Sequence, residues 1–238
     1  MEILNELDCL QDLFISRLRA DPLFGALIEG TISQAHLCAV YQEIWHCVCE
    51  TPRSLAAAAK TLSLYRSSGA RFSGEEFARF RTPFYGAILE ELETHAREER
   101  GHDDWMMSDL VALGADAEAV RRSQPGPAMS AYLAVFRHAA VGRTPLGVSG
   151  QAYMLEGLGP LLWAKTVENL RRRSNIPNIA QAVYCLASHA EVDRHHREEA
   201  RRRLVGFTDR RDYDAIVFNA RATIDTWGGL SFDIIRRG

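Results

Sequence analysis

The stretch HAEVDRHH, residues 189–196, contains the pattern His189-x-x-x-Asp193-x-x-His196. Successive residues of an α-helix are about 100° apart, so Asp193 lies roughly 40° from His189 and His196 roughly 20° on the other side. The three side chains therefore project from one stripe over two turns. Two imidazoles and a carboxylate suit borderline divalent metals such as iron, manganese or zinc. The pattern predicts a metal-binding helix, and the sequence around it predicts the fold.

The sequence on both sides of this stretch is helical nearly throughout. Apolar residues recur at spacings of three and four, which is typical of amphipathic helices, and runs of alternating polarity are absent. Glycine and proline at Gly157, Gly159-Pro160 and Gly228-Gly229 interrupt two of the helices. The sequence predicts one all-α domain over residues 1–238, a bundle of seven to eight helices. The helices are expected over 2–20, 33–50, 53–65, 83–113, 129–141, 147–173, 177–206 and 209–236, with a further short helix opening at Ser73.

The composition excludes several classes of protein. Hydrophobic residues make up 47% of the chain and charged residues 25%, as in ordinary globular proteins. The net charge of −3 gives no reason to expect a nucleic-acid target. No stretch of 18 apolar residues predicts a membrane span, and the N-terminus does not resemble a secretory signal. Five irregularly spaced cysteines indicate a reducing compartment, so we expect a cytoplasmic protein.

A second candidate metal motif precedes the middle of the chain. Glu99 and His102 form an E-x-x-H pair, which places both side chains on one helix face. Carboxylate-bridged di-iron and di-manganese bundles use this pair together with lone glutamates from other helices. Chance alone produces such a pair often, and Glu98 is an equally good partner for His102 by spacing. The motif indicates a metal site only in combination with the histidine-rich helix.

Two isolated glutamates complete the candidate set. Glu43 has apolar neighbours at helical spacing, and Glu156 is the only charged residue between Val148 and Trp163. A buried carboxylate is costly unless it binds a metal or pairs with a group such as Tyr or Arg, and both alternatives stay open. Two octahedral metal ions that share bridging carboxylates need about seven protein ligands. The potential ligands are Glu43, Glu99, His102, Glu156, His189, Asp193 and His196.

These motifs resemble those of the haem-oxygenase-like iron oxidases and oxygenases, also called haem-oxygenase-like di-metal oxidases. The resemblance covers residues 33–205 and depends on YQEIWH (41–46), EERGHDDW (98–105), Glu156 and the pattern at 189–196. It implies a seven-helix haem-oxygenase-like bundle with a non-haem iron or di-iron centre and no haem. By match to the motifs, Glu99, His102, Glu156, Asp193 and His196 are ligands. Glu43 matches the glutamate of the first helix, and His189 an additional ligand of some members.

The chain departs from the family pattern in two places. Residues 67–86 look like an insertion before the metal-bearing helix, and His95 stands where some members have a glutamate. His95 is therefore either a variant ligand or a surface histidine. Four further residues are expected beside the ligands, in the pocket or on the surface: His46, Glu98, Tyr153 and His195.

The resemblance implies an enzyme that uses iron, with manganese as an alternative metal, to activate O2. Known members oxidise small organic substrates such as fatty acids, amines and amino acids. The same fold also hosts the cofactorless pyrroloquinoline quinone synthases (PqqC-like) and the TenA-like thiaminases, and fold alone does not decide between these functions. A non-catalytic helical module that binds a ligand or a protein is the third alternative. The expected partners are a small-molecule substrate and O2, without nucleic acid or membrane, in a possible homodimer.

Overall fold

The computed structural model of the chain describes residues 2–67 and 75–237. Within these ranges the chain forms helices joined by turns, and no strand occurs. The all-α prediction is therefore confirmed. The elements are α1 (Glu2–Ala20), α2 (Pro22–Glu29), α3 (Gln34–Ser67), α4 (Glu75–Ala78), η1 (Arg79–Arg81), α5 (Pro83–Glu98), α6 (His102–Ala112), α7 (Ala117–Arg122), α8 (Pro127–Val141), η2 (Pro145–Gly147), α9 (Val148–Glu156), η3 (Gly159–Trp163), α10 (Ala164–Arg173), α11 (Tyr184–Leu204), α12 (Arg210–Trp227) and α13 (Leu230–Arg237).

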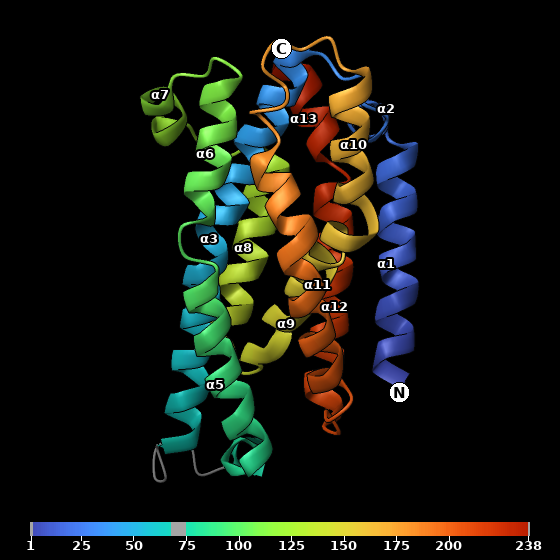
Figure 1. Ribbon diagram of the computed structural model, residues 1–238. Helices are drawn as coiled ribbons and strands as arrows, with labels where there is room; N and C mark the ends of the chain where they lie inside the picture. The colour runs from blue at the N-terminus through green and yellow to red at the C-terminus, as the bar shows by residue number, and fades with distance from the viewer. Residues whose placement is uncertain (1, 68–74, 238) are drawn as a thin grey trace.

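The long helices form one bundle around a continuous apolar core. In Figure 1, α3 runs down one side of the molecule, and α5 and α6 return beside it. Helix α8 packs on α3 and α12, while α11 packs on η3, α6 and α9. Helix α1 lies at the outer edge and contacts α12. Large side chains such as Tyr41, Tyr132 and Phe136 are fully buried between the helices, and their burial supplies most of the drive for this packing.

The predicted helix over 83–113 is wrong in one respect, because the structure divides it into α5 and α6. Residues 99–101 form a turn, and Gly101 has a φ of 92°, in the left-handed region. Glycine adopts that region without steric cost, so the chain can turn here and start α6 at His102. The break is important for the site, since Glu99 lies just before it and His102 just after it.

Thr51-Pro52 predicts a break or a kink in the helix, and the structure has no break there, because α3 continues through it. Pro52 lacks the amide hydrogen that a helix interior normally uses. The neighbouring hydroxyl of Thr51 donates to the carbonyl oxygen of Cys47 at 3.1 Å. Burial of apolar side chains on both halves of α3 outweighs the local cost of the proline.

The sequence predicts a helix that begins at residue 177, but α11 begins at Tyr184. Residues 177–183 form turns. The carboxylate of Asp109, on α6, accepts hydrogen bonds from the backbone amides of Tyr184 at 2.9 Å and Cys185 at 2.8 Å. These two amides are among those that a helix start leaves without a partner. A residue 75 positions away along the chain therefore caps α11 and positions it.

Other predicted interruptions are confirmed. The expected helix over 147–173 is divided by η3, a π-helical segment that includes Gly159-Pro160. The expected helix over 209–236 is divided at Gly228-Gly229 into α12 and α13. Helix α2, which the sequence analysis did not predict, follows Asp21, whose carboxylate accepts from the amides of Leu23 and Phe24. Asp21 is thus an N-cap with a proline after it, a common helix start.

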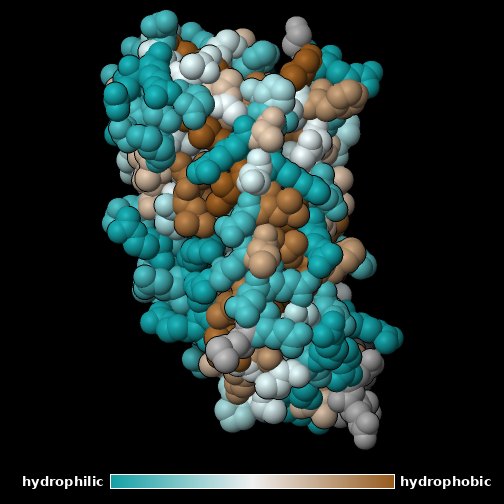
Figure 2. Space-filling view, turned by 90° about the vertical axis from the view of Figure 1, so that its right-hand side faces the viewer, coloured by the Kyte–Doolittle hydropathy of each residue, from teal (hydrophilic) through white to brown (hydrophobic). Residues whose placement is uncertain are grey.

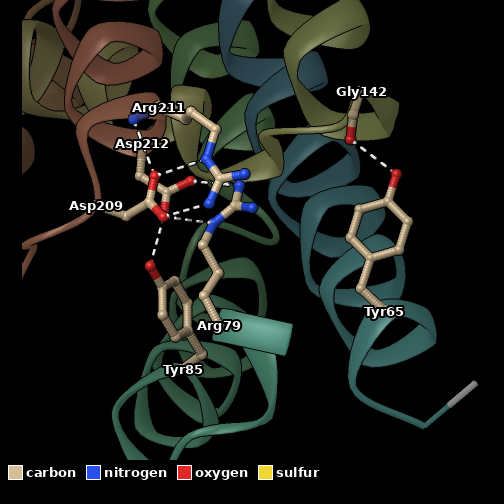
Figure 3. A network of polar contacts seen from close by, with 7 residues as sticks. All are labelled: Tyr65, Arg79, Tyr85, Gly142, Asp209, Arg211 and Asp212. Atoms are coloured by element: carbon tan, nitrogen blue, oxygen red, sulfur yellow. Dashed lines mark hydrogen bonds and ion pairs between the residues drawn. The ribbon is translucent and has the colours of Figure 1, made fainter. Parts of the chain in front are cut away.

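Within the predicted insertion at 67–86, Arg79 and Tyr85 are held to the start of α12 by a network of polar contacts (Figure 3). Residues 68–74, including Ser73, lie outside the described residues. Arg79, on η1, contacts the fully buried carboxylate of Asp212 at 3.1 Å. The hydroxyl of Tyr85 donates to the same carboxylate at 2.5 Å. Asp209 lies 3.6 Å from Arg79 and 2.6 Å from Arg211. The network fixes the start of α5, the helix that leads to Glu99.

The surface has two features that bear on partners. Among the described residues, no single helix has both the length and the hydropathy of a membrane span. Helices α2 and α3 reach those values only together, across a bend of 105°. Apolar residues gather on the upper half of the face seen in Figure 2. Exposed apolar residues of α12 and α13 include Phe218, Phe232 and Ile235.

Candidate metal centre

The turn between α5 and α6 brings Glu99 and His102 together. Both side chains are buried, and the Nδ1 atom of His102 lies 3.1 Å from Oε2 of Glu99. The ring of His102 stacks on Trp105 with centroids 3.9 Å apart, which restrains its orientation. A Cβ atom on Gly101 would meet no neighbour within 4 Å. Conformation, and not crowding, is therefore what requires a glycine at this position.

Helix α11 supplies His189, Asp193 and His196 from one face, as their spacing predicts. Asp193 is 3% exposed and His196 is 5% exposed. The Nδ1 atom of His189 lies 2.9 Å from the carbonyl oxygen of Cys185, one helical turn earlier. A carbonyl only accepts hydrogen bonds, so His189 carries its proton on Nδ1 and keeps a lone pair on Nε2. A backbone carbonyl commonly orients a metal-binding histidine in this way.

The π-helical segment η3 brings Glu156 and Asp193 to the same place. Glu156 ends α9 just before this segment and is 6% exposed. A Cβ atom on Gly159 would lie 2.5 Å from Oδ2 of Asp193 and 2.6 Å from the carbonyl oxygen of His189. Only a glycine lets α11 pass so close to η3. π-Helical turns are frequent at functional sites, because they change the direction of side chains.

The predicted ligands meet in two triads that share one residue. His95, Glu99 and His196 form the first triad, and Glu99, His102 and His189 form the second. Within each triad the candidate ligand atoms lie within 4.8 Å of one another. The imidazole pairs are correspondingly close, with ring centroids 4.7 Å apart in the first triad and 5.0 Å in the second. Glu99 lies between the two pairs, in the position of a bridging carboxylate.

Glu156 and Asp193 extend this cluster of residues. The Oε1 atom of Glu156 lies 3.1 Å from Nε2 of His95. Asp193 belongs to neither triad but is buried close enough to Glu156 and Glu99 for their charges to affect it. Three buried carboxylates and four imidazoles thus occupy one region of the bundle. The two triads with Glu156 and Asp193 are called the cluster below.

The electrostatics of the cluster fit a bound cation. Burial, reinforced by Glu156 and Glu99, raises the pKa of Asp193 well above its ordinary value. Burial alone would lower the pKa of His95, but the carboxylates of Glu156 and Glu99 outweigh it and raise that pKa. Burial would likewise raise the pKa of Glu99, but the neighbouring imidazoles of His102 and His95 lower it. In the described part of the chain, the ion-pair partners of Glu99 and Glu156 are the imidazoles of His95, His102 and His196.

Several buried polar atoms of the cluster also lack a hydrogen bond. They are Oε2 of Glu156, Nε2 of His95 and Nδ1 of His196. Native proteins rarely leave buried polar atoms unsatisfied, and such atoms commonly mark an ion or a catalytic role. Imidazole nitrogens with carboxylate oxygens are the ligands that iron, manganese and zinc accept. The residues present therefore fit a pair of divalent metal ions.

An apolar cavity of about 90 Å³ opens beside the cluster. His95, Glu99, Glu156, His189 and Asp193 form its polar wall. Its other walls are mostly apolar and include Ile44, Val48, Phe136, Leu158, Trp163 and Trp227. Enclosed sites of this kind, apolar with a few convergent polar groups, are typical of small-molecule binding sites.

Glu43 lies elsewhere, and the structure does not bring it together with the other predicted ligands. Its carboxylate accepts hydrogen bonds from Arg237 at 2.6 Å and from the backbone amide of Gly126 at 3.0 Å. It belongs to neither triad and does not line the cavity. The apolar surroundings of Glu43 are thus explained by the second alternative, a buried ion pair. His46 is likewise outside the cavity, and its Nε2 atom lies 3.1 Å from the hydroxyl of Ser123.

Tyr153 and His195 also lie away from the cluster. Tyr153 is buried, but its hydroxyl donates to Asp8 at 2.5 Å and ties α9 to α1, so the prediction of a pocket residue is corrected. His195 is exposed and lies 3.2 Å from Glu199 on the surface. Glu98, by contrast, is beside the cluster, with Oε2 at 3.3 Å from Nε2 of His196.

Three residues have a larger role in the site than their sequence context indicates. His95, one turn before Glu99, is a full member of a triad. Cys185 orients His189 through its carbonyl oxygen, and its position four residues earlier was the only signal for this contact. Gly159 allows the close passage of α11. The last effect depends on tertiary packing, which a single sequence does not reveal.

Comparison with known proteins identifies the family and the fold. The sequence model of the iron-containing redox enzyme family matches residues 38–228. A domain of unknown function with a haem-oxygenase-like fold from Shewanella denitrificans OS217 has a TM-score of 0.78 and 18% identity, over 97% of this chain and 90% of that one. No curated protein matches the sequence.

Two further structures carry the same fold. A TenA homologue from Pseudomonas syringae pv. tomato DC3000 has a TM-score of 0.74 and 14% identity, over 99% of this chain and 91% of that one. A TenA homologue from P. horikoshii OT3 has a TM-score of 0.65 and 15% identity, over 99% of both chains. Identities this low show a shared fold and no more. The bundle is haem-oxygenase-like, and the chain belongs to the family of iron-containing redox enzymes.

Proposed function

We propose that this protein is a non-haem, iron-dependent oxidase or oxygenase with two iron ions in the cluster. The observation that supports the proposal most strongly is the pair of triads sharing Glu99, because its carboxylate would be able to contribute to two adjacent metal sites. Iron bound there would supply O2 activation, with manganese as the alternative metal. Glu99, His95 and His196 would hold one ion, and Glu99, His102 and His189 the other. Glu156 and Asp193 would add carboxylate oxygens.

The surrounding residues have identifiable tasks in such an enzyme. The carbonyl of Cys185 keeps the Nδ1 proton of His189 in place, so that Nε2 faces the cluster as a neutral donor. The stacking of Trp105 restrains the ring of His102. The apolar walls of the cavity exclude water from the reacting groups and favour a substrate with an apolar portion. A fatty acid, an amine or an amino acid would each satisfy this requirement.

The thiaminase alternative gains less support from the structure. Its chemistry needs a reactive thiolate, and two cysteines, Cys47 and Cys185, line the cavity. Burial raises the pKa of Cys47 to about 12 and that of Cys185 well above its ordinary value. Both thiols are therefore protonated near neutral pH. His189 lies 3.5 Å from the sulfur of Cys185, but its Nδ1 proton is already donated to a carbonyl.

The proposal is tested by O2 consumption of the iron-loaded protein. The substitutions His196→Ala and Glu156→Ala each remove a side chain of the cluster and should abolish iron-dependent O2 consumption. His36→Ala changes an exposed histidine of α3 and should leave it unchanged. Unchanged O2 consumption in either cluster variant would show that this centre is not the site of the reaction.

A further inference from the structure

We propose that a depression between α5 and α11 is the route by which a divalent cation reaches the cluster, with Glu98 passing it inward. The inference rests on the proposed function, since it presumes that the cluster binds metal. The depression has a volume of about 290 Å³. It is called the acidic depression here and is lined by Ala87, Glu90, Glu91, Thr94, His95, Glu98, His196, Glu199 and Arg203.

The charge of the acidic depression favours a cation. It has four carboxylates and a single guanidinium, and the guanidinium of Arg203 is already paired with Glu91 at 3.1 Å. In the part of the chain that the structure describes, neither Glu90 nor Glu98 has a lysine or arginine partner. Their side chains face the solvent at least in part, since Glu90 is exposed and the side chain of Glu98 is 47% exposed. Such a concentration of negative charge raises the local concentration of cations.

The floor of the acidic depression is the cluster itself. His95 and His196 line the depression and also form the first triad with Glu99. Each is more than nine-tenths buried, and Nε2 of His95 and Nδ1 of His196 lack hydrogen bonds. Glu98 connects the two regions, because its half-exposed carboxylate lies 3.3 Å from Nε2 of His196. The carboxylates at the surface and the ligand atoms inside therefore form one continuous path.

Two other hollows lie near the cluster, and neither suits the entry of a hydrated cation. The cavity on the inner side has mostly apolar walls, where a charged and hydrated ion is costly to transfer. The groove between α3 and α5 is lined by no residue of the cluster. It also carries four cationic side chains and two carboxylates, and so has a net positive charge; the cations are Arg53, Lys60, Arg97 and Arg100. Of these three hollows, only the acidic depression both reaches the cluster and attracts a dication. Metal and organic substrate would thus reach the cluster from different sides.

The transfer involves ligand exchange without a redox change. A hydrated cation first binds the exposed oxygens of Glu90 and Glu98 and keeps most of its water. Glu98 then carries it inward past His196, whose Nε2 atom faces Glu98 while its Nδ1 atom faces Glu99. Release from Glu98 into the triad of His95, Glu99 and His196 completes the transfer, and the displaced water leaves through the depression.

The experiment measures the rate of Co2+ uptake by the metal-free protein, followed by the visible absorption of bound cobalt after rapid mixing. The variants are Glu98→Gln, Glu90→Gln and the double variant. The matched control is Glu93→Gln, which removes a carboxylate of the same helix that lines the basic groove instead. At low ionic strength the double variant should take up Co2+ about tenfold more slowly than the wild type. The final Co2+ content should be unchanged, and high salt should reduce the difference.

Each other outcome overturns a defined part of the account. If the double variant takes up Co2+ at the wild-type rate, cations reach the cluster by another route. If Glu98→Gln lowers the final Co2+ content, Glu98 is a permanent ligand and not a transfer group. If Glu93→Gln slows uptake as much as the double variant, overall charge and not the depression controls the rate. If the wild type binds no Co2+, the proposed metal centre fails together with the route.

Discussion

Glu99 is the residue on which both halves of the proposed centre depend, because it is the only member of both triads. The substitution Glu99→Gln removes its charge while keeping its shape, so it should reduce metal content from two ions per chain to less than one. Glu43→Gln is the matched control, since that carboxylate pairs with Arg237 and Gly126. It should keep both ions and lose about 1 kcal/mol of stability. Metal analysis and urea unfolding of the two variants check these expectations.

The opposite pattern would contradict the assignment of both glutamates. Metal content that survives Glu99→Gln but falls in Glu43→Gln would restore Glu43 as a ligand. It would also mean that the pairing of Glu43 with Arg237 gives way when metal binds.

Asp209 gives a prediction about acid stability. Its hydrogen bond with the Arg211 side chain, followed by the Arg211 amide and the charge of Arg79, lowers the pKa of Asp209 to about 2. A lowered carboxyl pKa stabilises the fold fully above the ordinary value of 3.8, and this contribution is lost as the pH falls through about 2. Asp209→Asn should therefore cost about 1 to 2 kcal/mol near neutral pH.

The measurement is the free energy of unfolding of wild type and Asp209→Asn between neutral and acid pH. Asparagine still caps the first turn of α12, so the difference reports the charge. The two curves should converge as the pH falls from about 4 to about 2. A difference that is constant over this range would show that the charge of Asp209 contributes nothing.

Single residues show what the sequence could predict and what it could not. The stripe of His189, Asp193 and His196 could be predicted, because helical spacing alone brings these residues together. Glu43 and Glu156 were indistinguishable, since each is a carboxylate among apolar neighbours. What separates them is Arg237, which lies 194 residues from Glu43 along the chain. A contact at that separation leaves no periodic signal.

At the scale of helices, the turn between α5 and α6 determines the relative positions of Glu99 and His102. Gly101 and Gly114 bracket α6, both have left-handed backbone conformations, and neither has a neighbour that an added Cβ atom would touch within 4 Å. Gly101→Ala and Gly114→Ala should therefore cost about the same stability, about 1 kcal/mol each. Only Gly101→Ala should weaken metal binding, because only that turn lies between two ligands.

Thermal unfolding measures the loss of stability in each variant, and metal titration measures the loss of metal affinity. Equal losses of metal affinity in both variants would mean that general destabilisation, and not the turn at Gly101, explains the effect.

The helices themselves were largely predictable, but their ends were not. Apolar spacing located α1, α8 and α12, because amphipathic periodicity persists over their whole length. The start of α11 depends on a cap from Asp109 on another helix. This contact between elements is one that local sequence patterns do not encode. The break before α6 occurs at Gly101, which has a left-handed backbone conformation. A single glycine within a helical pattern is compatible with a break or with a continuous helix, so the sequence alone did not locate this break.

At the scale of the whole molecule, the cluster joins helices that are distant in sequence. Its residues come from α5, the following turn, α6, α9 and α11, so a bound metal ion would link these elements in the folded state only. Ligands that bind only the folded state stabilise it by about 2.7 kcal/mol at a hundredfold excess over the dissociation constant. Adding Fe2+ without oxygen should therefore raise the melting temperature of the wild type by several degrees.

His196→Ala serves as the matched variant for this measurement. It should show little or no rise in melting temperature, while His36→Ala should respond as the wild type does. An equal rise in all three proteins would indicate that iron binds elsewhere, on the surface for example. The homodimer stays a prediction at this scale.

The most direct test of the account is the number and environment of iron ions bound by the metal-free protein after anaerobic loading. Titration with Fe2+ should end at two ions per chain, and the Mössbauer spectrum should show high-spin ferrous ions in mixed nitrogen and oxygen coordination. Glu99→Gln should bind less than one ion per chain, and its ferrous Mössbauer signal should weaken accordingly. A wild-type protein that binds no iron under these conditions, or whose bound iron is unaffected by Glu99→Gln, would contradict the proposal of a two-iron centre built on Glu99.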